Sequence, residues 1–340
     1  MAQETSAHER RGRADVEQYA RHPPSLPMLE LGSHDELGRA SRALRNALLA
    51  LRVPPGVLGA MGALAPGRRA SAAWSRLTAS HAYWTGVRRA ADRETYRRLR
   101  RGVLILMYHG IGAPGEPPSR YVVPAARFRR QMEWLKRRRY NVIALEELLR
   151  ARAAYRLAPP KSVVITLDDG YLDNLTRAKP ILEQLGLPAT IFLVSAGGEA
   201  NGWSTTPGVA GRPLMSLDGA REACDALLSF GAHSMTHPKL PQVSPEEARR
   251  EIEGSKRELE AALAVPVTTF AYPYGEVDAD VRDAVVAAGF AAACSTRPGR
   301  NRPADDDFAL RRVEVYGTDR LARFAATLAV GELPRRRHRS

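Results

Sequence analysis

The sequence predicts an α/β protein whose parallel strands alternate with helices and close into a (β/α) barrel. From Gly102 to Leu333, short apolar runs alternate with amphipathic stretches, the pattern of right-handed βαβ units and a parallel sheet. The alternation continues without a break, which favours a barrel over an open doubly wound sheet. Polar side chains also follow several apolar runs, and we expect these to line one rim: His109, Asp168, Asp169, His233 and Tyr274.

Each strand is predicted from a short apolar run, and each helix from apolar residues at helical spacing. The expected strands are 103–109, 162–167, 189–194, 290–295 and 309–316, with the short stretches 140–143, 232–234 and 268–275 between helices. The expected helices are 123–139, 144–155, 171–186, 216–231, 244–264, 278–289 and a last one from Asp319. Phe128, Met132 and Leu135 fall near one face of the first helix.

The first hundred residues differ in composition from the rest of the chain. Residues 1–30 are polar and are expected to form a disordered arm. Residues 31–100 are rich in Ala, Leu and Arg and predict a helical, basic extension. Trp74, Leu77, His81 and Trp84 recur at helical spacing there. Two interpretations stay open: a basic amphipathic helix lying on a membrane, or a helical cap packed on the main domain.

The charge balance indicates anionic surroundings. The formal net charge is +14, carried mostly by arginine, which suits a phospholipid face, an acidic polymer or a phosphorylated carrier. No helix-turn-helix, zinc-finger or RNP pattern is present, so we expect no nucleic-acid partner. Residues 335–340 are expected to form a solvated basic tail.

Features that bear on location are few. Cys224 and Cys294 are the only cysteines, too few for a disulfide framework. The first residues lack the apolar core of a secretory signal. The uncharged stretch 53–67 is too short to span a bilayer, although an interfacial segment is possible. The expected location is cytoplasmic or the cytoplasmic face of a membrane.

The run VVITLDDG, residues 163–170, brings two adjacent carboxylates to the end of a buried strand. Like charges repel, and a desolvated carboxylate is costly unless it is paired. A bound cation removes both difficulties, because one carboxylate then ligates it while its neighbour accepts a proton from the attacking water. In the structural alternative, one aspartate is the N-cap of the next helix. That alternative leaves the second aspartate unexplained.

The stretch HSMTH places His233 and His237 four residues apart, a spacing that puts two imidazoles on one side of a single turn. Alone this signal is weak. Together with Asp169, the two histidines make a three-ligand set with an open position, which is the catalytic arrangement. In FAYPYG, Pro273 and Gly275 hold Tyr274 rigidly at a strand end, where a backbone N–H or the ring can meet an oxyanion. An aromatic turn packed on the core is the simpler alternative.

TLDDG, HSMTH and FAYPYG, in this order, resemble three motifs of the NodB-type polysaccharide deacetylases, carbohydrate esterase family 4. The resemblance covers the domain 101–334 and is closest to the subgroup of poly-N-acetylglucosamine deacetylases. It implies a deformed (β/α) barrel that hydrolyses N-acetyl groups on a hexosamine glycan or glycolipid. It also implies a divalent metal, usually zinc, with cobalt or manganese as alternatives. Carried over by position, the base is Asp168, the ligands are Asp169, His233 and His237, and the oxyanion contributor is Tyr274.

The chain departs from the family pattern at two points. Ala271 stands where many members carry an arginine that orients the base. Arg311 or Arg312 are the candidates to replace it from another strand. The usual late histidine motif is missing, and His338 lies in the basic tail. LMYHGIG resembles the subgroup in which a histidine from the first strand is the acid, which implies that His109 protonates the leaving amine.

Two other functions remain open at this point. One is a hydrolase of the same fold that acts on a non-glycan amide. The other is a catalytically silent glycan- or membrane-binding module, supported by Ala271 and the missing late histidine. The retained base, acid and ligands argue against silence, because a binding module has no need for them.

Overall fold

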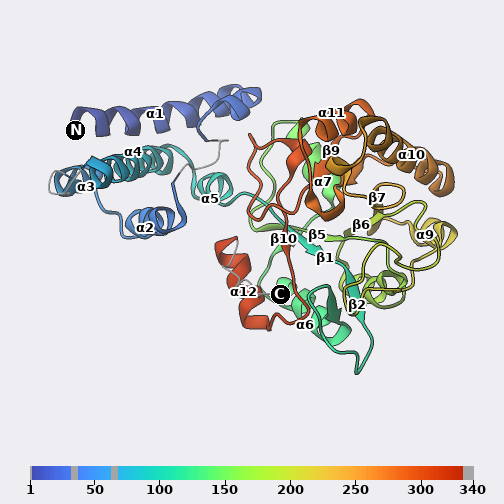
Figure 1. The fold of residues 1–340 in the computed structure, drawn as a ribbon. Coiled ribbons are helices and arrows are strands. Elements are labelled where there is room, and N and C mark those ends of the chain that lie inside the picture. Colours follow the sequence, from blue (N-terminus) through green and yellow to red (C-terminus); the bar gives the residue numbers. More distant parts are fainter. Residues whose placement is uncertain (1, 32–36, 63–67, 332–340) are drawn as a thin grey trace. The chain divides into compact units, whose positions relative to one another are not determined.

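The computed structural model describes residues 2–31, 37–62 and 68–331. The chain divides into two compact units. One comprises residues 1–102, 151–160 and 302–305 and is called the helical unit below. The other comprises residues 103–150, 161–301 and 306–340 and is called the sheet unit (Figure 1). The predicted basic tail, 335–340, lies outside the described residues.

The sheet unit is built on a parallel sheet with the strand order β10-β1-β5-β6-β7-β8-β9. The short strand β4 pairs with the first two residues of β5, whereas β6 pairs with its last two. A parallel bridge between Cys294 and Leu310 links the end of β9 to the segment before β10. The sheet therefore curls back on itself, as the predicted deformed (β/α) barrel requires. The strands are β1 Leu104–Tyr108, β4 Asn141–Val142, β5 Ser162–Leu167, β6 Ala189–Leu193, β7 Leu228–Ala232, β8 Thr269–Ala271, β9 Ala292–Cys294 and β10 Val313–Glu314.

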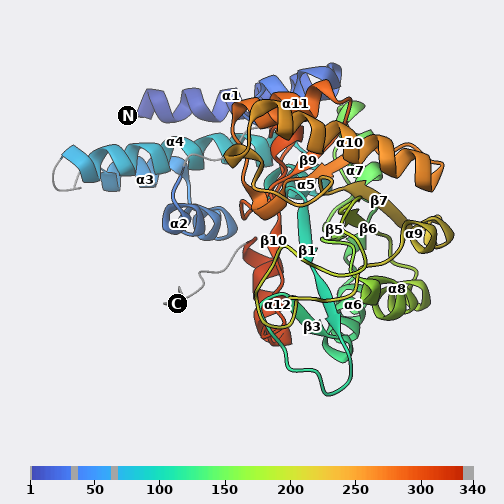
Figure 2. The same ribbon diagram turned by 45° about the vertical axis from the view of Figure 1, so that its right-hand side comes forward.

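Helices surround this sheet, with α6 beside α8 and α10 beside α11 (Figure 2). Phe128, Met132 and Leu135 of α6 are fully buried, so the predicted apolar face of this helix is confirmed. The helices are α6 Ala125–Arg137, α7 Leu145–Ala153, α8 Lys179–Leu185, α9 Leu217–Ala223, α10 Pro245–Leu263, α11 Ala279–Ala287 and α12 Leu321–Val330. A separate pair of short strands, β2 Gly110–Gly112 and β3 Val122–Pro124, follows β1.

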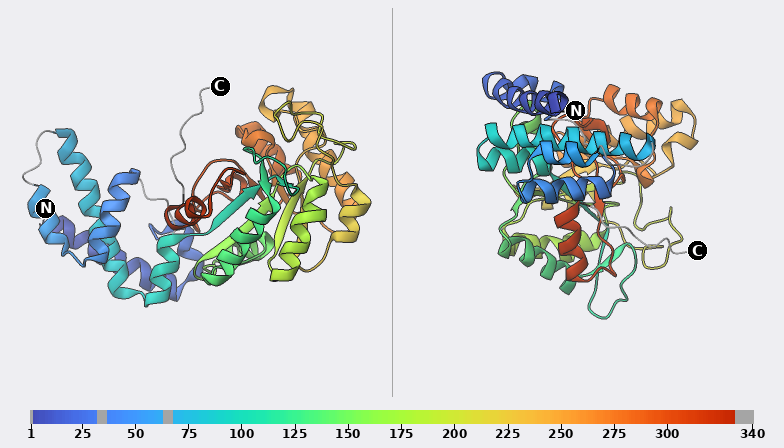
Figure 3. Two further views of the ribbon diagram at one scale, coloured as in Figure 1. Left: turned by 90° about the horizontal axis from the view of Figure 1, so that it is seen from below. Right: turned by 90° about the vertical axis from the view of Figure 1, so that its left-hand side faces the viewer.

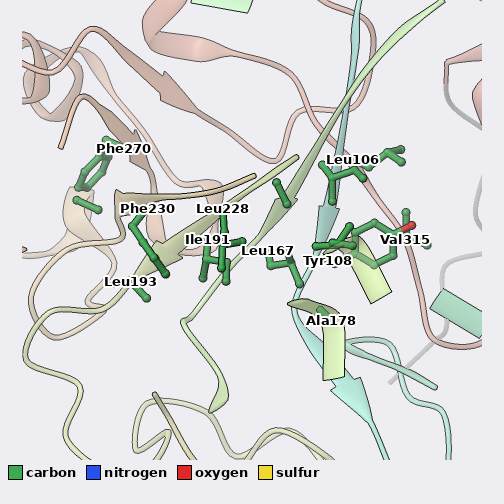
Figure 4. Close-up of a cluster of buried hydrophobic side chains, with 14 of the residues drawn as sticks. Leu106, Tyr108, Leu167, Ala178, Ile191, Leu193, Leu228, Phe230, Phe270 and Val315 are labelled. Carbon is green, nitrogen blue, oxygen red and sulfur yellow. The ribbon is translucent and has the colours of Figure 1, made fainter. Parts of the chain in front are cut away.

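The core of the sheet unit consists of apolar side chains from neighbouring strands. Leu106, Ile191, Phe230 and Phe270 come from four strands and meet in one cluster (Figure 4). Every residue of β1, β5 and β6 is buried, which explains why these strands read as continuous apolar runs and not as alternating ones. A strand buried on both faces leaves its end as the place for polar groups.

Two expected helices differ from the structure. Residues 216–231 were predicted as one helix, but α9 ends at Ala223 and Leu228–Ala232 form β7. Asp225 makes the break, because its Oδ1 accepts the N–H groups of Leu227 and Leu228 (2.7 and 2.8 Å). The stretch 171–186 is likewise divided, into a turn, a short π-helical segment η2 at Asn174–Ala178 and α8.

The helical unit contains α1 Ala2–Arg21, α2 Arg39–Ala50, α3 Pro55–Gly62, α4 Arg68–Ala90 and α5 Arg93–Arg101. The disordered arm predicted for residues 1–30 is therefore wrong, since α1 runs alongside α4 (Figure 3). Gly12 and Gly86 permit this contact: a Cβ on either would lie 2.2 or 2.0 Å from a backbone oxygen of the opposite helix. No helix among the described residues is long and apolar enough to cross a membrane.

One glycine tests how tightly the sheet is packed. A Cβ at Gly231 would lie 2.5 Å from the Phe192 ring and 2.6 Å from Thr269 Oγ1. We expect Gly231→Ala to lower the free energy of unfolding by about 1–3 kcal/mol through overpacking, as measured by urea denaturation. Gly202→Ala is the control, because no atom lies within 4 Å of its Cβ position. Equal stability of the two variants would contradict the close packing described here.

Candidate metal centre

The two aspartates occupy a sharp turn at the end of β5. The Asp168 N–H still donates to Tyr108 O (2.9 Å) and continues the pairing with β1. Asp169 and Gly170 then both have left-handed backbone, with φ of 75° and 70°. Such a φ is uncommon for any residue with a side chain and is typical of functional sites. The turn therefore directs the two neighbouring carboxylates to different partners, as the sequence predicted.

Asp169, His233 and His237 come together as a cluster of three potential metal ligands. Asp169 Oδ1 lies 3.5 Å from His233 Nε2 and 3.4 Å from His237 Nε2, and all three side chains are buried. Two imidazole nitrogens and one carboxylate oxygen suit zinc and similar divalent ions. The structure thus brings together the three residues that the motifs predict as metal ligands.

The HSMTH stretch is a loop and not the helical turn suggested by its spacing. Ser234 and His237 have φ of 63° and 64°. Glu251 of α10 holds the loop, because its carboxylate accepts the N–H groups of Met235 and Thr236 (both 2.8 Å) and the Thr236 hydroxyl (2.6 Å). Sequence reasoning missed Glu251, which gave no signal beyond its place on a charged helix.

The surroundings of the two histidines fit a cation. His233 Nδ1 donates to Ala271 O (2.7 Å), so Nε2 is the ring nitrogen that faces Asp169. A backbone carbonyl in this role is the usual outer partner of a metal-binding histidine. His237 stacks on Trp203 at 4.8 Å between ring centroids, and its buried Nδ1 has no hydrogen-bond partner in the described part of the chain. The residues present therefore suit a divalent ion.

The electrostatics favour an ionised ligand carboxylate. Burial by itself raises the pKa of Asp169, but hydrogen bonds from His233 and His237 lower it well below the ordinary value. Asp169 is consequently ready to bind a cation without first losing a proton.

Asp168 forms a buried, bidentate ion pair with Arg312. Arg312 Nη1 and Nη2 donate to the two carboxylate oxygens at 2.6 and 2.7 Å. Burial raises the pKa of Asp168, and the Arg312 charge, followed by that of His233, lowers it below the ordinary value. Of the two arginines proposed as replacements at Ala271, Arg312 is the one that contacts Asp168, the predicted base. Arg311 points elsewhere, with its Cδ 3.0 Å from the Cβ position of Gly299.

His109 follows β1, and buried polar groups hold its backbone. Asn174 Nδ2 donates to His109 O (2.8 Å), and the Ile111 N–H donates to Asp173 Oδ1 (2.6 Å). Arg212 Nε in turn donates to Asp173 Oδ2 (2.5 Å). The His109 ring lies edge-on to Tyr121, with 4.9 Å between centroids. The sequence signal for these anchors was the Asp-Asn pair after DDGYL, which had been read as part of a helix.

Tyr274 lies beside the metal ligands in a strained turn. Its φ is 58°, its ring is edge-on to His237 with 4.6 Å between centroids, and 44% of it is exposed. Gly275 is required here, because a Cβ would come within 2.0 Å of Thr296 Oγ1. The third motif thus presents an exposed aromatic ring next to the cluster.

Comparison with known families agrees with this geometry. Residues 156–293 match the model of the polysaccharide deacetylase family, a span that includes both aspartates, both histidines and Tyr274. Residues 156–293 therefore form a polysaccharide deacetylase domain, which confirms the family that the motifs resemble.

Particular relatives differ in how much they share. YxkH of Bacillus subtilis is 26% identical over 211 residues, covering 62% of this chain and 70% of that protein. The poly-β-1,6-N-acetyl-D-glucosamine N-deacetylase of Staphylococcus aureus is 22% identical over 230 residues, covering 65% and 77%. The enzyme of the same name from Escherichia coli is 28% identical over 106 residues, only 15% of its length.

Solved structures share the fold of the sheet unit. The polysaccharide deacetylase BC0361 of Bacillus cereus has a TM-score of 0.55 and 26% identity, over 67% of this chain and 69% of that one. The Streptococcus pyogenes deacetylase PplD, solved with acetate, has a TM-score of 0.58 and 24% identity, over 67% and 98%. The second likeness shows the fold alone.

The ion pair at the base yields a stability prediction. Arg312→Met leaves Asp168 buried without its partner, so we expect the free energy of unfolding at neutral pH to fall by about 3–5 kcal/mol. Arg311→Met, one residue away, is the matched control and is expected to change it by less than about 0.5 kcal/mol. Denaturant unfolding of both variants measures the difference. A similar loss in both would show that Arg312 has no special part.

Proposed function

We propose that the sheet unit is a metal-dependent hydrolase that removes N-acetyl groups from amino-sugar residues of a glycan or glycolipid. The observation that supports the proposal is that a cluster of metal ligands lies next to a separate, ion-paired carboxylate. Asp169, His233 and His237 offer ligands to a cation, and Asp168, the residue before Asp169, is held ionised by Arg312. A purely structural metal site has no need for such a carboxylate beside its ligands.

The residues divide the chemistry between them. When bound, a divalent metal, with zinc the first candidate, polarises the acetyl carbonyl and lowers the pKa of water. Asp168 accepts the proton of the attacking water as the new C–O bond forms. His109, in its protonated form, donates to the amine nitrogen as the C–N bond breaks and acetate leaves. Tyr274 lies where its backbone N–H or ring can contact the developing oxyanion.

Arg312 orients the base through both of its oxygens, so the pair behaves as a single rigid group. This contact weakens the case for a catalytically silent module, because Ala271 was a main argument for silence. The poly-N-acetylglucosamine deacetylases among the relatives support a β-linked N-acetylglucosamine polymer as the first substrate to test. A non-glycan amide is the alternative that the same experiment distinguishes.

Two neighbouring substitutions separate the base from the ligand. Asp168→Asn removes the proton acceptor, so we expect acetate release from N-acetylglucosamine oligomers to fall at least about 100-fold while bound zinc persists. Asp169→Asn removes a metal ligand, so this variant is expected to lose both the bound zinc and the acetate release. Zinc content by atomic emission and acetate by a coupled assay provide the readouts. Near-normal turnover in Asp168→Asn would refute the assignment of the base.

The acid is tested with a matched pair of histidines. His109→Gln is expected to lower kcat by about 100-fold or more with little change in KM, since the proton transfer occurs in the transition state. His22→Gln, in the helical unit, is expected to keep full activity.

Chelator treatment of the native chain should abolish activity, and zinc, cobalt or manganese should restore it. Acetate release that resists chelation would contradict the metal requirement.

If zinc binds stoichiometrically but no acetate appears from glycan oligomers, small N-acyl amides become the substrates to test. That outcome would favour the non-glycan alternative. If the chain binds no zinc and releases no acetate, the result would instead favour the catalytically silent binding module.

A further inference from the structure

The helical unit contains a basic segment that the proposed chemistry does not use. Between Leu37 and Ala91 the sequence holds nine arginines and no aspartate, glutamate or lysine. Helices α2, α3 and α4 occupy this segment. A run of this length without any acidic residue creates a positive potential that internal ion pairs within the segment cannot cancel.

Exposed apolar side chains accompany these charges. Four of the eleven large apolar residues exposed in the described structure lie within eighteen residues of each other: Leu44 (44% exposed), Leu51 (76%), Val57 (48%) and Met61 (54%). Val57 and Met61 are four residues apart on α3 and share a face of that helix. Leu51, the C-cap residue of α2, follows Leu44 by seven residues and so lies at the end of the face that carries Leu44.

The opposite side of α3 is firmly packed. Leu58 is 1% exposed and forms a cluster with Leu37 and Leu77, while Trp74 Nε1 donates to Leu58 O (2.8 Å). The exposed face of α3 is therefore not a helix that has lost its core contacts. It is a second apolar face, presented outward by a helix that is already anchored.

A cavity of about 290 Å³ opens at the α2–α3 turn, and three arginines line it: Arg52, Arg88 and Arg89. Arg88 donates to Leu49 O and Arg89 to Glu9, whereas Arg52 is exposed and has no ion-pair partner among the residues described. His81 Nε2 contacts Val53 O (2.8 Å), and Val53 N–H donates to Leu48 O (3.0 Å). These bonds fix the turn, so the cavity is formed before any ligand arrives.

We propose that the α2–α3 turn binds the surface of an anionic phospholipid membrane. Leu51, Val57 and Met61 enter the interface, and Arg52 and Arg88 contact a headgroup phosphate at the cavity. Arginine suits this role because its guanidinium binds phosphate oxygens in a bidentate manner. Apolar side chains next to cations, with no acidic residues, are typical of helices that lie in a membrane interface.

A nucleic acid fits these observations less well. Phosphate contacts would use the arginines, but four exposed aliphatic side chains would gain nothing from a polyanionic backbone. The membrane proposal concerns the helical unit only. It does not depend on the proposed deacetylase activity, which the variants below should leave unchanged.

The test is co-sedimentation of the full chain with phosphatidylcholine vesicles, with and without phosphatidylglycerol. We expect binding to the anionic vesicles only, and its loss at high salt because the surface charges are then screened. Arg52→Gln with Arg88→Gln is expected to weaken partitioning by about 30-fold. Leu51→Ser with Val57→Ser is expected to weaken it by about tenfold or more.

Matched control variants distinguish binding at this site from nonspecific adsorption to vesicles. Met28→Ser changes a 90% exposed apolar residue of the same unit, and Arg257→Gln changes an exposed arginine on α10. Both are expected to change partitioning by less than about twofold, with circular dichroism to show that every variant is folded. Equal binding to neutral vesicles, or equal loss in the controls, would overturn the proposal.

Two further measurements identify other sources of phosphate. Calorimetry with inorganic phosphate that gives Arg52-dependent binding, in a chain that ignores vesicles, would assign the cavity to a soluble phosphate and overturn the membrane proposal. The full chain is also tested for retention on duplex DNA. If retention is lost in the arginine variants but kept in the Leu51→Ser, Val57→Ser variant, the arginines bind nucleic acid, and the membrane proposal is overturned. Vesicle binding that needs both residue classes supports the proposal.

Discussion

The ion pair between Asp168 and Arg312 is the constraint on which the candidate site depends. Both side chains are almost fully buried, and removing two charges from water costs several kcal/mol per ion unless the geometry is close to ideal. The bidentate contact meets that condition. It also ties the end of β5 to the segment entering β10, on the two sides of β1, so the position of Asp168 is fixed by the closure of the sheet itself.

The same principle explains how the loops around the site keep their shape. Two of the segments around the candidate site are held by a buried carboxylate that accepts backbone N–H: Glu251 for the HSMTH loop and Asp173 for the segment after His109. Loops without regular pairing leave backbone donors that must be satisfied. Charged acceptors satisfy them strongly, and the left-handed residues Ser234 and His237 of the HSMTH loop can then persist despite their strain.

Sequence patterns predicted the fold well where burial was complete. The continuous apolar runs of β1, β5 and β6 could only be central strands of a parallel sheet, and the structure agrees. The patterns failed where a polar residue interrupted a helix-like stretch. Asp225 ends α9 by accepting two N–H groups, and the arm at residues 1–30 becomes helix α1 because Gly12 and Gly86 let it approach α4. Such contacts have no periodic signature.

By itself the sequence determined which residues gather at the rim, because short motifs at strand ends carry their own local geometry. It named Asp168, Asp169, His233 and His237 before any contact was known. Only the tertiary structure decided that Arg312 and not Arg311 pairs with Asp168, and that Glu251 holds the HSMTH loop. Those partners are separated from the motifs by many residues and lie on other elements. Their roles arise from how the strands and helices pack, and that packing is set by the whole chain.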